Sequence, residues 1–217
     1  MPGGCSVNAA LLRIRKMQLQ LEIPTELQDA IKAIPWKDVK HASYRKCKSV
    51  HFGLGTFRNC YRGAFFGRGS KTMPELQALL TNFIRKAAPE INFASIIVNR
   101  YAPGESMDEH VDKNWTRQPV QIVGRFGDSS GAELKVGDRL LHTGVFLVNG
   151  NVPHSVLPCR DGILYSFVSY IKQKAMTVIG PALLQLRSWG FQLEEVERAD
   201  ELKNSRLASR TVRPACA

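Results

Sequence analysis

Short apolar runs separated by turn residues dominate the second half of the chain and most constrain its fold. From Ile91 onward, Gly, Asn, Asp and Pro interrupt the sequence every few residues. Short strands at this spacing predict a β-sandwich or barrel and not parallel β-α-β units. The expected strands are INFASIIVNRY, PVQIVGRF, AELKV, DRLLH, GVFLVNG, HSVLP and ILYSFVSYIK.

Helices are expected before and after this strand region. Thr25 and Glu26 open a periodic LQDAIKAI segment, which predicts a capped helix over 25–33 that ends before Pro35. A second helix is expected to begin at Pro74, because MPELQALLTNFIRKAA places its large apolar residues on one stripe. Beyond Lys174 the pattern is again helical and then ends in a basic, aperiodic tail.

Composition is that of a folded domain with an excess of positive charge. Apolar residues make up 44% and charged residues 23%, and 30 Lys and Arg against 19 Asp and Glu give a net charge of +11. This excess favours polyanionic partners such as DNA or RNA, although a merely basic surface explains it equally well. No apolar run reaches the roughly 18 residues of a membrane span, so we expect no membrane association.

The cysteines bear on location, because the five are dispersed without a Cys-x-x-Cys pair. This pattern fits reduced thiols inside a cell, in the nucleus or cytoplasm. An organelle stays open, since the start of the chain has Arg13, Arg15 and Lys16 but no acid before Glu22. A short surface helix or a loose start is the favoured explanation of that segment. We expect a monomer.

The segment 48–71 interleaves basic and aromatic residues, KSVHFGLGTFRNCYRGAFFGRGSK. Cations for phosphates and rings for bases are the two components of single-strand nucleic-acid binding. The candidate contacts are Arg58, Arg62, Arg68 and Lys71. A glycine-rich β-hairpin with core aromatics is the equal alternative. A phosphate loop is excluded, because Lys71 follows Ser70 and not a glycine.

The stretch NRYAPGESMDEHVDKN contains the first candidate metal ligands, His110 and Asp112. In extended backbone, residues i and i+2 point to one face, so both side chains can bind one ion. Two histidines and one carboxylate leave three positions open on Fe(II) in non-haem oxygenases. A third ligand is therefore expected on a later strand. His154 in NVPHSVLP is favoured over His142, and His41 and His51 are poorer candidates.

The same stretch resembles the Asn-x-Tyr-Ala-Pro-Gly and His-x-Asp-Lys run of the AlkB-type Fe(II)/2-oxoglutarate dioxygenases. The later segments FGDSSGAELKV and VPHSVLPCRDGILYSFVSY are similar to the TET/JBP group of that superfamily. The resemblance spans roughly residues 90 to 172. It implies an α+β, mainly β fold: a double-stranded β-helix, or jelly roll, with the N-terminal helices packed on one sheet. We divide the chain into a basic segment 1–20, a jelly-roll domain 21–175 and a helical extension with a basic tail 176–217.

The resemblance also implies roles for individual residues. Fe(II) would be held by His110, Asp112 and His154. Asn99 and Tyr101 would hydrogen-bond the cosubstrate 2-oxoglutarate, and Asn114 would orient the nucleic-acid substrate or the Asp112 carboxylate. Simpler interpretations are that Tyr101 is a core residue and that Asp112 and Asn114 cap turns.

One position departs from the superfamily pattern. Aligning DGILYSFVSY on the usual Arg-x-Ser pattern through Ser166 places Leu164 where an arginine binds the far carboxylate of 2-oxoglutarate. Leucine cannot bind a carboxylate. The replacements considered are Arg160 or Lys172 from nearby positions, or Arg125 or Arg139 from another strand. Otherwise the cosubstrate differs, for example ascorbate, or catalysis is lost.

The resemblance implies a dioxygenase that uses O2 to oxidise a methyl group of a nucleobase in DNA or RNA. A base inside a duplex would have to be flipped or already unpaired to enter such a site. Two alternatives stay open. One is a catalytically degenerate nucleic-acid-binding module on the same fold, and the other is a protein or small-molecule hydroxylase.

Overall fold

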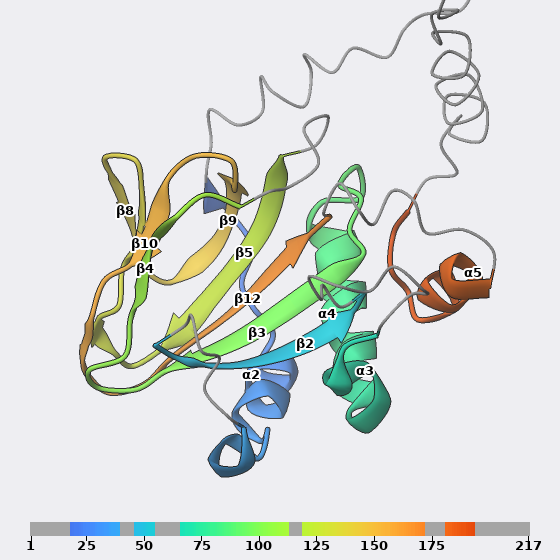
Figure 1. The fold of residues 1–217 in the computed structure, drawn as a ribbon, viewed down its shortest axis with the longest axis horizontal. Helices are drawn as coiled ribbons and strands as arrows, with labels where there is room; N and C mark the ends of the chain where they lie inside the picture. Colours follow the sequence, from blue (N-terminus) through green and yellow to red (C-terminus); the bar gives the residue numbers. More distant parts are fainter. Residues whose placement is uncertain (1–17, 40–45, 55–65, 113–118, 172–180, 194–217) are drawn as a thin grey trace, which may run out of the picture.

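Two facing antiparallel sheets form the centre of the protein, and helices cover one of them (Figure 1). The computed structural model describes residues 18–39, 46–54, 66–112, 119–171 and 181–193. The larger sheet has the order β1 (Gln18–Leu19), β9 (Gly144–Asn149), β5 (Val120–Gly127), β12 (Leu164–Tyr170), β3 (Ser95–Tyr101) and β2 (Lys48–Gly53). The smaller sheet has the order β4 (Met107–His110), β10 (His154–Val156), β7 (Leu134–Val136) and β8 (Arg139–Leu141).

A two-stranded sheet of β11 (Cys159–Asp161) and β6 (Ser130–Gly131) completes the strands of the described ranges. All seven predicted apolar runs contain strands, so this part of the prediction is confirmed. Strands β1, β2, β4, β6 and β11 were not among the runs predicted from apolar patterning. The polar sequence MDEH of β4 explains its omission, because strand prediction depends on alternating apolar residues.

The helices begin close to where the sequence placed them. Helix α2 spans Thr25–Lys32, and its expected side-chain cap is absent, since Pro24 occupies the N-cap position. Helix α4 spans Pro74–Ala87 with Pro74 in its first turn, as predicted. The other helices are η1 (Trp36–Asp38), α3 (Arg68–Thr72) and α5 (Pro181–Ser188). The three-segment division of the chain stays a prediction.

Alternation along the strands of the larger sheet creates two hydrophobic cores. Outward residues such as Ile96, Val98 and Phe167 pack with Leu80 and Ile84 of α4. Figure 1 shows α2 and α4 on this side of the sheet, away from the smaller sheet. Inward residues form a second core between the two sheets, made of residues such as Val123, Leu134, Phe146, Val156 and Leu164. The predicted mainly β jelly roll with helices on one sheet is confirmed.

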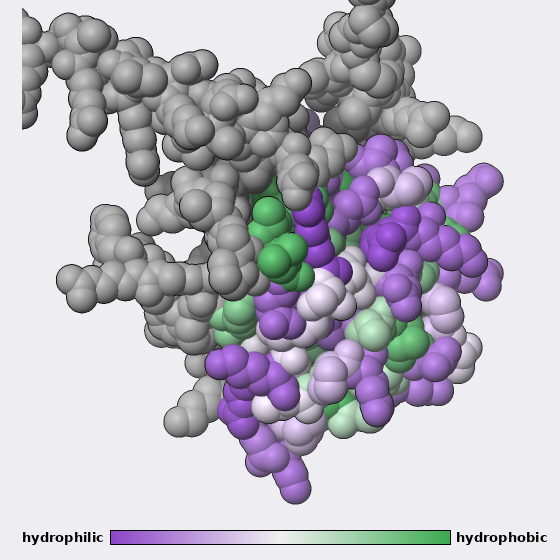
Figure 2. All heavy atoms as spheres, turned by 90° about the vertical axis from the view of Figure 1, so that its right-hand side faces the viewer, coloured by the Kyte–Doolittle hydropathy of each residue, from purple (hydrophilic) through white to green (hydrophobic). Residues whose placement is uncertain are grey.

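Few large hydrophobic side chains are exposed in the described part of the chain. Among the described residues the exposed large hydrophobic side chains are Val111, Leu140 and Leu184. The face that carries α5 is mostly hydrophilic, with small hydrophobic areas (Figure 2). No helix in the described ranges is both long enough and apolar enough to cross a bilayer.

Gly124 in the central strand β5 gives a prediction about stability. A Cβ atom at Gly124 would lie 2.1 Å from Cζ of Phe167, whose ring packs against Phe83 with centroids 5.6 Å apart. Gly124→Ala should therefore lower the free energy of unfolding by about 1–3 kcal/mol through overpacking. Denaturant titration measures this loss, and adding Phe167→Leu should recover part of it. Wild-type stability of the single variant would show that the sheet relaxes without cost.

Candidate metal centre and pocket

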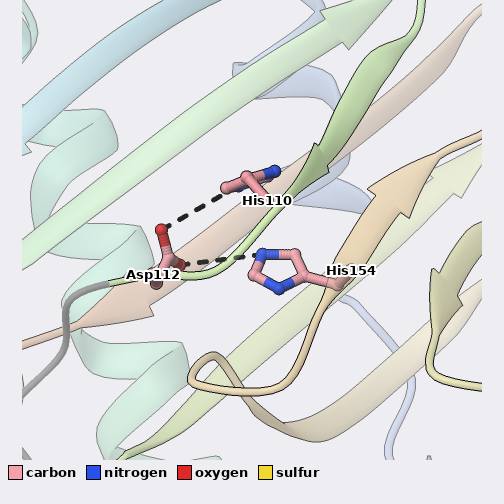
Figure 3. A group of neighbouring side chains, drawn as sticks. All are labelled: His110, Asp112 and His154. Atoms are coloured by element: carbon pink, nitrogen blue, oxygen red, sulfur yellow. Dashed lines mark ion pairs between the residues drawn. The ribbon is translucent and has the colours of Figure 1, made fainter.

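Pairing between β4 and β10 brings two histidines together. His110 at the end of β4 lies directly opposite His154 at the start of β10, and their ring centroids are 4.3 Å apart. Asp112, two residues beyond His110, lies beside them (Figure 3). One potential ligand atom from each of the three lies within 4.8 Å of the others. Residues far apart in the sequence therefore form one cluster at the edge of the smaller sheet.

The geometry of this cluster suits a metal ion. His110 Nε2 lies 3.9 Å from Asp112 Oδ1, and His154 Nε2 lies 3.8 Å from Asp112 Oδ2. Bonds of about 2.1 Å at right angles would bring ligand atoms to about 3 Å from one another, so small side-chain rotations suffice. Two imidazoles and one carboxylate are the donor set of non-haem Fe(II) oxygenases. The residues present therefore fit Fe(II).

Both imidazoles have their other ring nitrogen engaged by backbone. His110 Nδ1 donates to the Asp108 carbonyl at 2.9 Å, and His154 Nδ1 donates to the Val152 carbonyl at 2.8 Å. Because a carbonyl only accepts, these bonds leave the Nε2 lone pair for a metal. Burial lowers the pKa of His154, which favours the neutral, metal-binding form.

Asp112 is held by neighbouring strands. Its backbone N–H donates to the Gly150 carbonyl at 2.8 Å. Gln121 on β5, which is 2% exposed, donates from Nε2 to Asp112 Oδ2 at 2.6 Å. The carboxylate is thus oriented before any metal binds.

The inward face of the larger sheet forms the floor of a pocket below these ligands, and polar residues cross it in one row. Ser49, Asn99, Ser166 and Arg125 lie directly opposite one another on β2, β3, β12 and β5. Ser49 Oγ donates to Asn99 Oδ1 at 2.8 Å, and Asn99 Nδ2 donates to Ser166 Oγ at 3.3 Å. Asn99 therefore links Ser49 to Ser166, and this polar row ends at a cation.

An apolar row separates the polar row from the metal ligands. Ile97, Val168 and Val123 are the next inward residues on β3, β12 and β5, about 7 Å further along the strands. Gln121, the following inward residue on β5, contacts Asp112. All of these residues except Ser49 line one pocket together with His110, Asp112 and His154. From one end to the other, the pocket is cationic, then apolar, and then lined by the candidate metal ligands.

Arg125 is the buried cation of this pocket. It is 2% exposed, and burial lowers its pKa to about 10, so the guanidinium still carries its charge at neutral pH. Nε donates to the His142 carbonyl at 2.8 Å, and Nη2 donates to the Ala132 carbonyl. Within the described ranges no carboxylate lies at ion-pair distance from it. Glu133 raises the pKa of Arg125 from beyond ion-pair distance, and the hydrogen bonds of Arg125 go to neutral carbonyls. A buried cation hydrogen-bonded in this way favours an anionic ligand.

Comparison with known proteins identifies the fold. No protein-family profile matches the sequence, and no curated protein matches it. Among solved structures, NgTET1 in complex with 5mC DNA has a TM-score of 0.51 at 11% identity, over 76% of this chain and 77% of that chain. The chain has the fold of the Fe(II)- and 2-oxoglutarate-dependent oxygenases. The fold implied by the sequence resemblance is confirmed.

Two further structures are similar at lower scores. An oxidoreductase of the 2OG-Fe(II) oxygenase family from Burkholderia pseudomallei has a TM-score of 0.48 at 16% identity, covering 78% of this chain and 91% of that chain. A prolyl-4-hydroxylase from Pseudomonas putida has a TM-score of 0.45 at 16% identity, covering 77% and 100%.

On this oxygenase fold, the structure brings the three predicted metal ligands together with Asn99 and Tyr101 in one pocket. Asn99 and Tyr101 line the pocket, and Tyr101 is 1% exposed with its hydroxyl 4.0 Å from the Met107 sulfur. His154, and not His142, joins the ligand cluster. His142 is an exposed residue whose Nδ1 lies 4.0 Å from Glu133 Oε1.

The structure distinguishes the described candidates for the arginine expected at position 164 by where they lie. Leu164 is buried between the sheets opposite Tyr101 and Gly127. Arg139 on β8 and Arg160 on β11 are exposed and do not line the pocket. Arg125 does line it, one strand away from Leu164 and directly opposite Ser166.

Several predicted contacts lie elsewhere or outside the described residues. Arg68 and Lys71 are exposed on α3, which lies beside β2. The predicted hairpin alternative for 48–71 is partly seen, because Leu54 and Phe66 pair as an isolated bridge. The positions outside the described ranges are Arg58, Arg62, Asn114, Lys172 and His41.

Gln121 was missed by sequence reasoning. The strand PVQIVGRF carries Gln121, Val123 and Arg125 at alternate positions, so all three share one face. Two polar residues on the inward face of an otherwise apolar central strand are the sequence signal that could have identified Gln121.

Proposed function

We propose that the protein is an Fe(II)- and 2-oxoglutarate-dependent dioxygenase that oxidises a methylated nucleobase in DNA or RNA. The observation that carries this proposal is a single pocket with the His110, Asp112 and His154 cluster at one end and the buried Arg125 cation in its floor. Neither feature is required by the fold itself, and both cost stability unless a ligand uses them.

The order of groups along the pocket matches a five-carbon dicarboxylate. Arg125 and Ser166 would bind the far carboxylate, Ile97, Val123 and Val168 would contact the methylene carbons, and the 2-oxo acid would lie at the metal ligands. This places the carboxylate-binding arginine on β5 instead of at Leu164 on β12. When bound, Fe(II) supplies the activation of O2 that oxidises a C–H bond as 2-oxoglutarate is converted to succinate and CO2.

Charge distribution supports a nucleic-acid substrate. The described residues contain as many acidic as basic side chains, so the whole excess of +11 belongs to the other segments. Of these, 55–65, 113–118 and 172–180 contain basic residues and no acid. Segment 113–118 directly follows Asp112, and 172–180 follows Ile171 on the chain. The similar structure NgTET1 was determined with 5mC DNA.

The test measures succinate formation by the full chain with Fe(II), 2-oxoglutarate and O2. Oligonucleotides carrying a methylated base, single-stranded or duplex, are compared with unmethylated ones, and the nucleosides are analysed by mass spectrometry. We expect stimulated turnover and an oxidised or demethylated base only with the methylated oligonucleotide.

Salt dependence separates this proposal from its alternatives. Phosphate contacts should make oligonucleotide affinity fall steeply with ionic strength. Salt-sensitive oligonucleotide binding without any 2-oxoglutarate turnover would favour the catalytically degenerate nucleic-acid-binding module. Turnover that no oligonucleotide stimulates would instead favour a protein or small-molecule hydroxylase.

A further inference from the structure

The short hydrogen bond between Gln121 and Asp112 distinguishes the two oxygens of the candidate metal-binding carboxylate. Gln121 Nε2 lies 2.6 Å from Oδ2, the oxygen that is also 3.8 Å from His154 Nε2. Oδ1 lies 3.9 Å from His110 Nε2 and accepts no hydrogen bond from a described residue. Oδ2 of Asp112 therefore accepts a hydrogen bond from an amide, whereas Oδ1 accepts none from a described residue.

The amide orientation follows from chemistry. A glutamine presents either an NH2 group or an oxygen, and only the NH2 group attracts a carboxylate. A neutral amide also leaves the full negative charge on Asp112, whereas Lys or Arg at this position would compete with a metal ion for it. Gln121 thus combines orientation of the carboxylate with retention of its charge.

The number of carboxylate oxygens that bind decides how many positions stay open. With two imidazoles and one oxygen, a six-coordinate metal keeps three positions for other ligands. A carboxylate that binds through both oxygens leaves only two. Chelation by a 2-oxo acid takes two positions, so O2 then has none.

We propose that Gln121 is a positioning residue that restricts Asp112 to one-oxygen metal binding and so preserves the position that O2 needs. The inference rests on the proposed function, since it assumes a metal at this cluster. Gln121 is suited to this task because it is buried on the central strand β5, whose position is fixed by pairing with β9 and β12. Its Nε2 to Asp112 contact joins the metal ligand to the same strand that carries Arg125.

The test compares Co(II) binding by wild type, Gln121→Met and Ile122→Val under anaerobic conditions. Methionine matches the length of glutamine without an N–H donor. Ile122→Val changes the neighbouring residue of the same strand, whose side chain packs in the core under the helices and does not line the pocket, and it serves as the matched control. The visible Co(II) spectrum reports coordination number, and thermal unfolding confirms that each variant is folded.

For Gln121→Met we expect Co(II) binding weakened roughly 10- to 100-fold, the range typical of lost outer contacts to metal ligands. We also expect a changed Co(II) spectrum, while Ile122→Val keeps the wild-type spectrum. Wild-type affinity and spectrum in Gln121→Met would overturn the inference and leave the proposed function standing. If Asp112→Ala left wild-type Co(II) binding unchanged, both the inference and the proposed function would be overturned.

Discussion

Asp112→Ala is expected to abolish Fe(II) binding at the cluster and all 2-oxoglutarate turnover. Asp112 is the only carboxylate among the three candidate ligands, and it lies within 4 Å of both imidazole Nε2 atoms. Its removal leaves two neutral donors and no negative charge to offset a divalent cation. Because loss of a mere outer contact weakens metal binding about 10- to 100-fold, loss of this ligand should exceed that range.

Anaerobic titration with Fe(II), followed by the absorbance that appears on adding 2-oxoglutarate, measures the effect. Asp108→Ala is the matched control, because Asp108 lies on β4, just before Asp112 in the chain, but is exposed and pairs with Lys46 at 2.9 Å. That surface pair should contribute little to stability or binding. Equal metal affinity in the two variants would show that the metal does not bind at this cluster.

The second large effect is expected at Arg125. Arg125→Gln removes the cation from the pocket while keeping a polar side chain that can still donate hydrogen bonds. Charge-assisted hydrogen bonds contribute about 1.5–3 kcal/mol each, so affinity for 2-oxoglutarate should fall roughly 100-fold or more. Fe(II) binding in the absence of 2-oxoglutarate should change little, because Arg125 is separated from the metal ligands by the apolar row.

Variants of the other candidate cationic residues serve as controls for this prediction. Arg139→Gln, Arg160→Gln and Lys172→Gln should each keep wild-type affinity for 2-oxoglutarate. Thermal unfolding of Arg125→Gln is measured alongside, since its bonds to the Ala132 and His142 carbonyls also hold the loop before β7 and the residue before the turn into β9. A large loss at Arg160 or Lys172, with none at Arg125, would assign carboxylate binding to that residue instead of Arg125. Stimulation by ascorbate alone would show that the cosubstrate is not 2-oxoglutarate.

The strands and two helices could be predicted because their signals are local. Short apolar runs mark β3, β5, β9 and β12, and Pro74 marks the start of α4. The ligand cluster could also be anticipated, since His110 and Asp112 lie two residues apart and His154 follows a turn between strands. Strand β4 could not, because its residues MDEH are polar and its position is fixed by pairing with β10.

The sequence provided a few candidates for the cationic residue that binds the far carboxylate of 2-oxoglutarate, but it could not identify which one does so. Choosing Arg125 requires the register between β5 and β12, which pairs Arg125 with Ser166 and depends on the folded sheet. Gln121 needed the same information, since its partner Asp112 lies just beyond β4, which belongs to the other sheet. The proposed nucleic-acid contacts at Arg58 and Arg62 stay predictions.

The row formed by Ser49, Asn99, Ser166 and Arg125 has a consequence for detecting proteins of this fold by sequence alignment. Adjacent strands lie only about 4.8 Å apart, less than the reach of an arginine side chain. A guanidinium can therefore move from one strand to its neighbour during evolution and still serve the same ligand. Alignments that score each column separately would record this exchange as a lost residue, whereas comparison across the width of the sheet would recover it.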